Sequence, residues 1–227
     1  MYRNLAELAH AALTAPGTGG AHAVPVRLDG VTRAAVADTC VRGDLGFALL
    51  LHRRKDGFVA EELYSSSRGD GGSWDVPDHL SGSMLGFDPT SDREIANVLR
   101  GASLVFGGES EMELYTGRPQ SDEGYELLRF HQLLVTPEAD HLEVEDTSPG
   151  AGGAPVRTRG APASHFAVVV CFPGERFTVR AMTGSGTGAR PLGDSWELTG
   201  PDPDQSPGAR RPTPPRPSGP SAPSSVR

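Results

Sequence analysis

The sequence predicts a mainly β protein, either a β-sandwich or an open barrel, with two short helices and a disordered C-terminal tail. Three observations support this prediction. Short runs with an apolar residue at every second position recur along the chain, and turn-forming Gly, Pro and Asp residues separate these runs. The 29 glycines and 20 prolines among 227 residues favour turns over long helices.

Two segments carry helical spacing instead. Apolar residues repeat every three or four positions in residues 4–15, where Asn4 and Glu7 match a capping box. A second capping box begins at Ser91 and predicts a helix over residues 92–100. Both helices should therefore be short and should pack one apolar face on the sheets.

Hairpin signals dominate the first third of the chain. Apolar residues alternate before the turn Asp29-Gly30, which leads into a second run over residues 31–36. Residues 46–53 are a strongly apolar expected strand, which turns at Lys55-Asp56-Gly57 and returns over residues 58–64. Asp-Gly suits a tight hairpin because both residues tolerate positive φ. Residues 65–73 are rich in Ser and Gly and are expected to form a flexible loop that contributes nothing to a core.

Strand patterns resume after the second helix. The clearest hairpin prediction joins residues 165–172 to residues 176–182, because Pro173-Gly174 fits the centre of a type II turn. The other expected strands are residues 103–106, 110–115, 125–135, 141–145 and 195–198.

Composition divides the chain at residue 198. Residues 1–198 are expected to form one mostly β globular domain, with a possible subdivision near 90–101. Of the 29 residues in 199–227, nine are Pro and five are Ser, so this tail buries too little apolar surface to offset its ordering entropy. Its PxxP spacing at residues 212–217 favours polyproline II, which docks on aromatic grooves, although a solvated tail has the same composition.

Charge and missing motifs exclude several function classes. A net charge of −8 and a pI near 5.3 argue against a non-specific nucleic-acid binder. The longest apolar run has seven residues, against about 20 for a membrane helix, so no membrane span is expected. The N-terminus lacks a signal-peptide pattern, which favours a cytoplasmic location by default. Phosphate-binding and hydrolase motifs are absent, so no cofactor is expected.

One cluster resembles a ligand or metal site. Asp75, Asp78 and His79 lie close together after the Ser/Gly-rich loop, and His52 is a possible fourth member. Carboxylates with imidazole suit a divalent metal, but a loop with surface Asp and His has the same sequence. The adjacent Trp74 could form the wall of a small-ligand pocket or could pack in the core.

Acidic residues alternate along two expected strands. The residues of each stripe share one face of their strand, and Arg176 and Arg180 line the matching face of the late hairpin. Opposite charges on neighbouring strands predict a solvated outer face, and the alternative is a cation site or a basic partner. The stripes are Glu109, Glu111 and Glu113, and His141, Glu143 and Glu145.

These observations favour a binding or interaction module without catalytic activity, which meets a protein partner through its exposed loops and tail. The first alternative is a metal-dependent hydrolase using Asp75, Asp78 and His79. The second is a small-ligand pocket between the sheets with Trp74 or Trp196 as its wall. The sequence leaves the oligomeric state open.

Overall fold

The structure is a computed structural model that describes residues 4–15, 28, 32–119, 121, 123–151, 157–160 and 165–205. It confirms a mainly β fold with two α-helices and several antiparallel sheets, and the described strands form no closed barrel. The elements in chain order are α1 (Leu5–Thr14), β1 (Ala34–Arg42), β2 (Leu45–Arg53), β3 (Val59–Ser67), β4 (Asp78–Met84), α2 (Asp92–Leu99), β5 (Leu104–Tyr115), β6 (Tyr125–Val135), β7 (His141–Asp146), β8 (Arg157–Gly160), β9 (Phe166–Cys171), β10 (Arg176–Thr183), η1 (Gly186–Gly188), β11 (Arg190–Pro191), β12 (Trp196–Thr199) and η2 (Pro203–Gln205).

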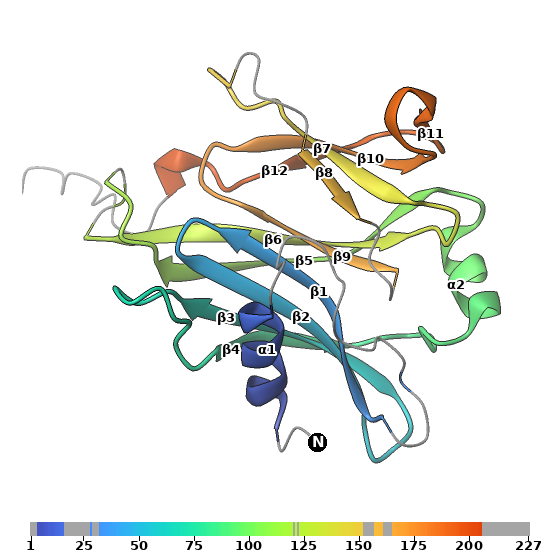
Figure 1. The fold of residues 1–227 in the computed structure, drawn as a ribbon, viewed down its shortest axis with the longest axis horizontal. Coiled ribbons are helices and arrows are strands. Elements are labelled where there is room, and N and C mark those ends of the chain that lie inside the picture. The colour runs from blue at the N-terminus through green and yellow to red at the C-terminus, as the bar shows by residue number, and fades with distance from the viewer. Residues whose placement is uncertain are drawn as a thin grey trace, which may run out of the picture.

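The strands form three sheets that stack as layers (Figure 1). The first sheet has the order β1-β2-β3-β4, and α1 lies across its outer face. The central sheet has the order β5-β6-β9. The outer sheet contains β11-β10-β7-β8, with β12 also paired to β10. The sandwich therefore has two apolar interfaces rather than one.

Strand β9 shows why its sequence is continuously apolar. Phe166, Val168 and Val170 pack into the core between the first and central sheets. Ala167 and Val169 pack into the core between the central and outer sheets. Since both faces of β9 are buried, alternation between apolar and polar residues disappears in this strand.

The hairpin expected between residues 165–172 and 176–182 is wrong in its pairing. The tight turn is present, because Glu175 N donates to Phe172 O at 3.1 Å and Gly174 has φ +76°. However, β9 pairs with β6, whereas β10 pairs with β7 and β12. Because β9 is apolar on both faces, it fits in the central sheet, where both of its faces are covered. The turn therefore leads from the central sheet to β10 in the outer sheet.

Side chains join the facing edges of β1 and β9. Asp38 accepts a hydrogen bond from Val168 N at 2.7 Å and forms an ion pair with Arg159. Arg159 donates to Val168 O at 2.9 Å and to Thr39 O at 2.8 Å. Arg42 donates to Val170 O at 2.6 Å. We call these contacts the β1–β9 seam, in which side chains replace the backbone ladder that would join two paired strands.

Both helices begin as predicted. The Asn4 side chain accepts from Glu7 N, and the Ser91 side chain accepts from Glu94 N. Helix α2 ends at Leu99, and the next residue, Arg100, adopts left-handed backbone angles. In the described part of the chain, neither helix is long and apolar enough to cross a membrane.

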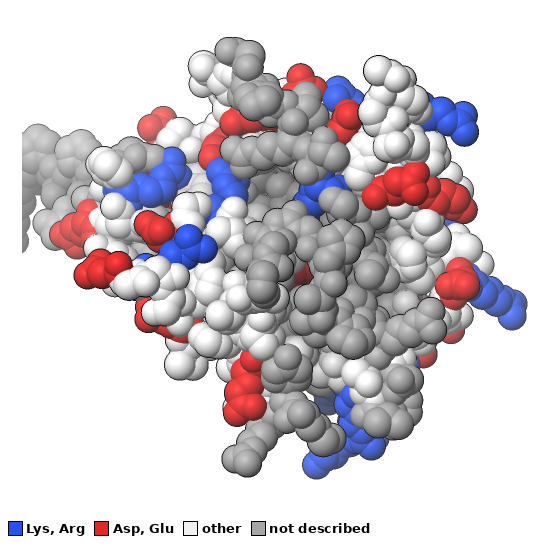
Figure 2. All heavy atoms as spheres, viewed as in Figure 1, with Lys and Arg blue, Asp and Glu red and all other residues white. Residues whose placement is uncertain are grey.

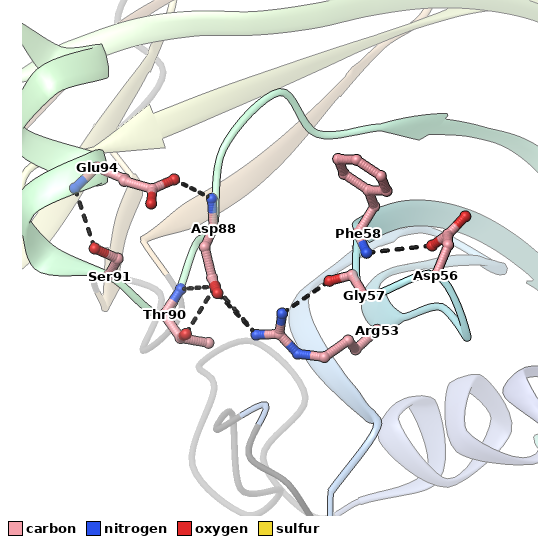
Figure 3. A network of polar contacts seen from close by, with 8 residues as sticks. All are labelled: Arg53, Asp56, Gly57, Phe58, Asp88, Thr90, Ser91 and Glu94. Atoms are coloured by element: carbon pink, nitrogen blue, oxygen red, sulfur yellow. Dashed lines mark hydrogen bonds and ion pairs between the residues drawn. The ribbon is translucent and has the colours of Figure 1, made fainter.

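A polar network holds α2 against the first sheet (Figure 3). Arg53 at the end of β2 donates to Gly57 O at 3.0 Å and to both carboxylate oxygens of Asp88. Asp88 also accepts from the backbone and hydroxyl of Thr90, and its own amide donates to Glu94. The β2–β3 turn and the segment before α2 are therefore one connected unit.

Several boundaries differ from those expected. Residues 65–73 do not form a loop throughout: β3 continues to Ser67, and Ser66 is only 5% exposed. The following strand, β4, was not predicted. At the other end, β12 and η2 extend the folded part at least to Gln205, beyond the boundary expected at residue 198. The expected turn at Asp29-Gly30 and residues 206–227 lie outside the described residues.

Candidate functional site

The structure separates the residues of the expected ligand or metal site. Trp74 is 8% exposed and packs with α1 residues in a core cluster, while the Arg68 guanidinium lies 4.5 Å from the centre of its ring. Asp75 accepts a hydrogen bond from the Ser67 hydroxyl at 2.9 Å. Trp74 is therefore a core residue, and Asp75 stabilises the end of β3.

His79 and His52 do come together, but on a carboxylate that the sequence reading missed. Glu62 lies 2.6 Å from His79 Nε2 and 3.6 Å from His52 Nδ1. Gly82 makes room for it, since a Cβ there would lie 2.2 Å from Glu62 Oε2. Asp78 is exposed and pairs with Ser65 in the β3–β4 register.

This His–Glu–His arrangement sits on the outer face of the first sheet, beside α1. The signal for it in the sequence was the polar pair Glu61-Glu62 between the apolar residues 59–60 and 63–64. The described residues contain no group of three or more His, Cys, Asp or Glu side chains arranged to hold a metal ion. The geometry of this cluster gives no specific support to metal-dependent hydrolysis.

The second tryptophan packs against β5. Trp196 stacks on Phe106 with ring centres 6.2 Å apart, and its indole N–H donates to Leu104 O. A pocket of about 580 Å³ lies beside α2, with Asp92 and Glu138 among its lining residues. Neither tryptophan lines it.

The most exposed aromatic pair in the described part of the chain lies at the end of the β5–β6 hairpin. Tyr115 and Tyr125 are 62% and 50% exposed, and their rings meet edge to face with centres 5.3 Å apart. Gly124 beneath them has φ +87°, and a Cβ there would lie 2.3 Å from the Tyr115 ring. Glycine therefore permits the tight approach of the ring to the turn.

Three glutamates lead along β5 to this pair. A β-bulge between Phe106 and Gly108 shifts the register of β5. After the bulge the strand is regular, and Glu109, Glu111 and Glu113 share the face of Tyr115 because they alternate along it. The shift turns Met112 and Leu114 on the opposite face toward the core between the first and central sheets. The expected acidic stripe is therefore present, and the bulge sets the side to which it points.

Arg129 on β6 neutralises part of this stripe. Its guanidinium lies 2.6 Å from Glu111 and 3.3 Å from Glu109. Burial lowers the pKa of the neighbouring His131 below 6.5, so His131 adds little positive charge at neutral pH. Three carboxylates thus face one permanent cation, which leaves the surface acidic.

We call the surface made by Glu109, Glu111, Glu113, Tyr115 and Tyr125 the β5–β6 face. Figure 2 shows acidic and basic side chains next to one another at the left end of the view, where the tips of the β5–β6 hairpin and of the β3–β4 connection lie in Figure 1. Carboxylates pair with guanidinium groups, and tyrosine rings stack on guanidinium groups and proline rings. The combination suits a basic, extended peptide segment.

The other expected stripe behaves as a solvated face. Glu143 pairs with Arg180 in the β7–β10 register, and the Arg180 guanidinium lies 3.0 Å from Glu145. Both partners of this ion pair are more than a third exposed. The stripe on the outer sheet is balanced across strands, whereas the β5–β6 face has an excess of carboxylates.

Comparisons with protein-family models, with curated proteins and with solved structures found no match to this chain.

Proposed function

We propose that this chain is a non-enzymatic binding module whose β5–β6 face takes a basic, extended segment of a protein. The observation that carries the proposal is the exposed pair Tyr115–Tyr125 beside a row of glutamates on one strand face. Aromatic rings and carboxylates together recognise arginine more strongly than either does alone, because the guanidinium can stack and form ion pairs.

The geometry favours an extended partner. The three glutamates follow one strand, and alternate side chains of a strand lie on one face about 7 Å apart. A polyproline II segment rises about 3.1 Å per residue, so every second or third residue meets the next anchoring position.

A fluorescent peptide tests this proposal. The probe has twelve residues, in which arginines alternate with proline and alanine, and its control carries glutamates in place of the arginines. Fluorescence anisotropy should detect binding of the basic probe only, with affinity that falls as salt screens the carboxylates. Tyr115→Ala should weaken it about tenfold, since stacking on guanidinium contributes about 1 kcal/mol or more.

Phe58→Ala is the matched control variant. Phe58 is also 62% exposed but lies at the β2–β3 turn, so its removal should leave binding unchanged. Equal affinity of the Tyr115→Ala and native chains for the probe, or no binding by either at millimolar concentration, would overturn the proposal.

A small-ligand site remains a second candidate because of the pocket beside α2. Asp92 and Glu138 line it, and both act electrostatically on His165, whose backbone has φ +64°. Strained backbone and clustered titratable groups are frequent at binding sites, and two carboxylates suit an amine. A thermal-shift screen of small amines, repeated with Glu138→Gln, tests this candidate. An amine that binds in the pocket should raise the melting temperature of the native chain and not that of the variant, whereas an amine that stabilises both chains does not use this pocket.

A further inference from the structure

On the basis of the proposed function, we propose that the β5–β6 face is occupied in cis by residues 206–227 of the same chain. Three features carry this inference: the place where the described chain ends, the charge of the segment that follows, and the length of chain available. The segment would act as a built-in competitor for an external partner.

The described chain ends close to the β5–β6 hairpin. Thr199 O accepts hydrogen bonds from Arg129 Nη1 at 3.2 Å and His131 Nε2 at 3.0 Å, so β12 ends against the base of the face. Gly174 N then donates to Pro201 O at 2.9 Å, which brings η2 to the turn after Phe172.

That turn touches the tip of the hairpin. The Arg118 guanidinium lies 4.1 Å from the centre of the Phe172 ring. Arg118 belongs to the loop between Tyr115 and Tyr125, where Thr116 N and Gly117 N both donate to Gly124 O. Residue 206 therefore follows directly after a segment that contacts the turn at residues 172–175, and the Phe172 side chain of this turn meets the hairpin loop through Arg118.

The charges of the two parts are complementary. Residues 206–227 contain four arginines and no acidic residue, and so contribute +4 to the net charge of −8. The remaining 205 residues therefore carry −12. The arginines are interspersed with prolines around residues 210–217, which matches the combination of ion pairing and ring stacking that the face offers.

The available chain is long enough for docking in cis. Pro212 follows Gln205 by seven residues. An extended segment rises about 3.1 Å per residue, which gives a reach of roughly 20 Å before the PxxP segment begins. A short linker sets an effective concentration in the millimolar range, so even a weak intrinsic interaction populates the bound state.

Fluorine NMR on the full-length chain tests the inference. The chain is labelled with 3-fluorotyrosine, and the signals of Tyr115, Tyr125 and Tyr64 are assigned from single Tyr→Phe variants. The test variant is R210Q/R211Q/R216Q, which removes three charges without shortening the chain. Its Tyr115 and Tyr125 signals should shift, while the signal of Tyr64, which is only 9% exposed, stays in place.

Added peptide separates docking in cis from binding between copies. A synthetic peptide with the sequence of residues 206–227 should restore the native signals in the variant. The arginine–proline probe should bind the variant about threefold to tenfold more tightly than it binds the native chain, because competition in cis is removed. Native signals that change with protein concentration would overturn docking in cis in favour of a second copy.

The outcomes also distinguish this inference from the proposed function. If the triple variant leaves both tyrosine signals unchanged while the probe still binds in a Tyr115-dependent way, the cis inference fails and the binding function stands. If neither the peptide nor the probe affects Tyr115 and Tyr125, both fail.

Discussion

The β1–β9 seam gives the sharpest prediction of the stability of this fold. Asp38 is 4% exposed, and it accepts from Val168 N and Thr39 N while pairing with Arg159. Burial raises the pKa of Asp38, and the Arg159 guanidinium and the Val168 amide oppose that rise. The Asp38 carboxylate in turn raises the pKa of Arg159, which stays charged.

Asp38→Ala should therefore be strongly destabilising. The substitution leaves the Val168 amide without its side-chain acceptor, which costs about 1–3 kcal/mol for a buried donor. It also leaves the Arg159 guanidinium, with 16% of its side chain exposed, without its counter-charge. Removing one partner of a buried ion pair costs about 3–5 kcal/mol of unfolding free energy. This value already includes part of the cost of the unpaired Val168 amide, so the two costs are not added.

Equilibrium unfolding in urea measures this cost from the shift of the midpoint at constant slope. The control is Glu145→Ala, which breaks the exposed Arg180–Glu145 ion pair and should cost at most about 1 kcal/mol. The double variant Asp38→Leu/Arg159→Met should be more stable than Asp38→Ala, because no unpaired charge remains. A loss below about 1 kcal/mol for Asp38→Ala would refute the seam as a stabilising feature.

Three further predictions concern pH, the tyrosine pair and α2. Burial holds the pKa of His131 below its unfolded value of 6.5, so the stability that neutral His131 contributes is complete above pH 6.5 and is lost as the pH falls toward the folded pKa. His131→Gln should therefore reduce the slope of the unfolding free energy against pH, to which one group contributes at most about 1.4 kcal/mol per pH unit. Gly124→Ala should destabilise the chain by more than Gly150→Ala, as measured by thermal unfolding, because both positions have φ near +90° but only Gly124 has a ring within 4 Å of the added Cβ. Arg53→Ala should lower the unfolding free energy measured in urea by about 1–2 kcal/mol, because it removes the hydrogen bonds to Asp88 and Gly57. Arg54, whose side chain is 49% exposed, is the control, and Arg54→Ala should leave the unfolding free energy nearly unchanged. Equal losses for the two variants would contradict the network.

Local chemistry in the sequence was sufficient to predict where several individual helices, strands and turns lie. The caps at Asn4 and Ser91 place both helices, because a side-chain oxygen that satisfies a free amide acts within three residues. The range expected for residues 125–135 matches β6 to the residue, and Pro173-Gly174 forms the expected turn. The acidic residues of β5 were identified from their alternation alone.

The tertiary structure decided which strands pair and which side chains meet. Strands β9 and β10 are adjacent in sequence but lie in different sheets, because a turn of two residues specifies a reversal of the chain and not the partner of each strand. Glu62 reaches His79 across 17 residues, and Tyr115 reaches Tyr125 across a loop, so their contacts depend on register. Period-two spacing determines that a strand has two faces, and only the packing of distant layers determines what each face meets.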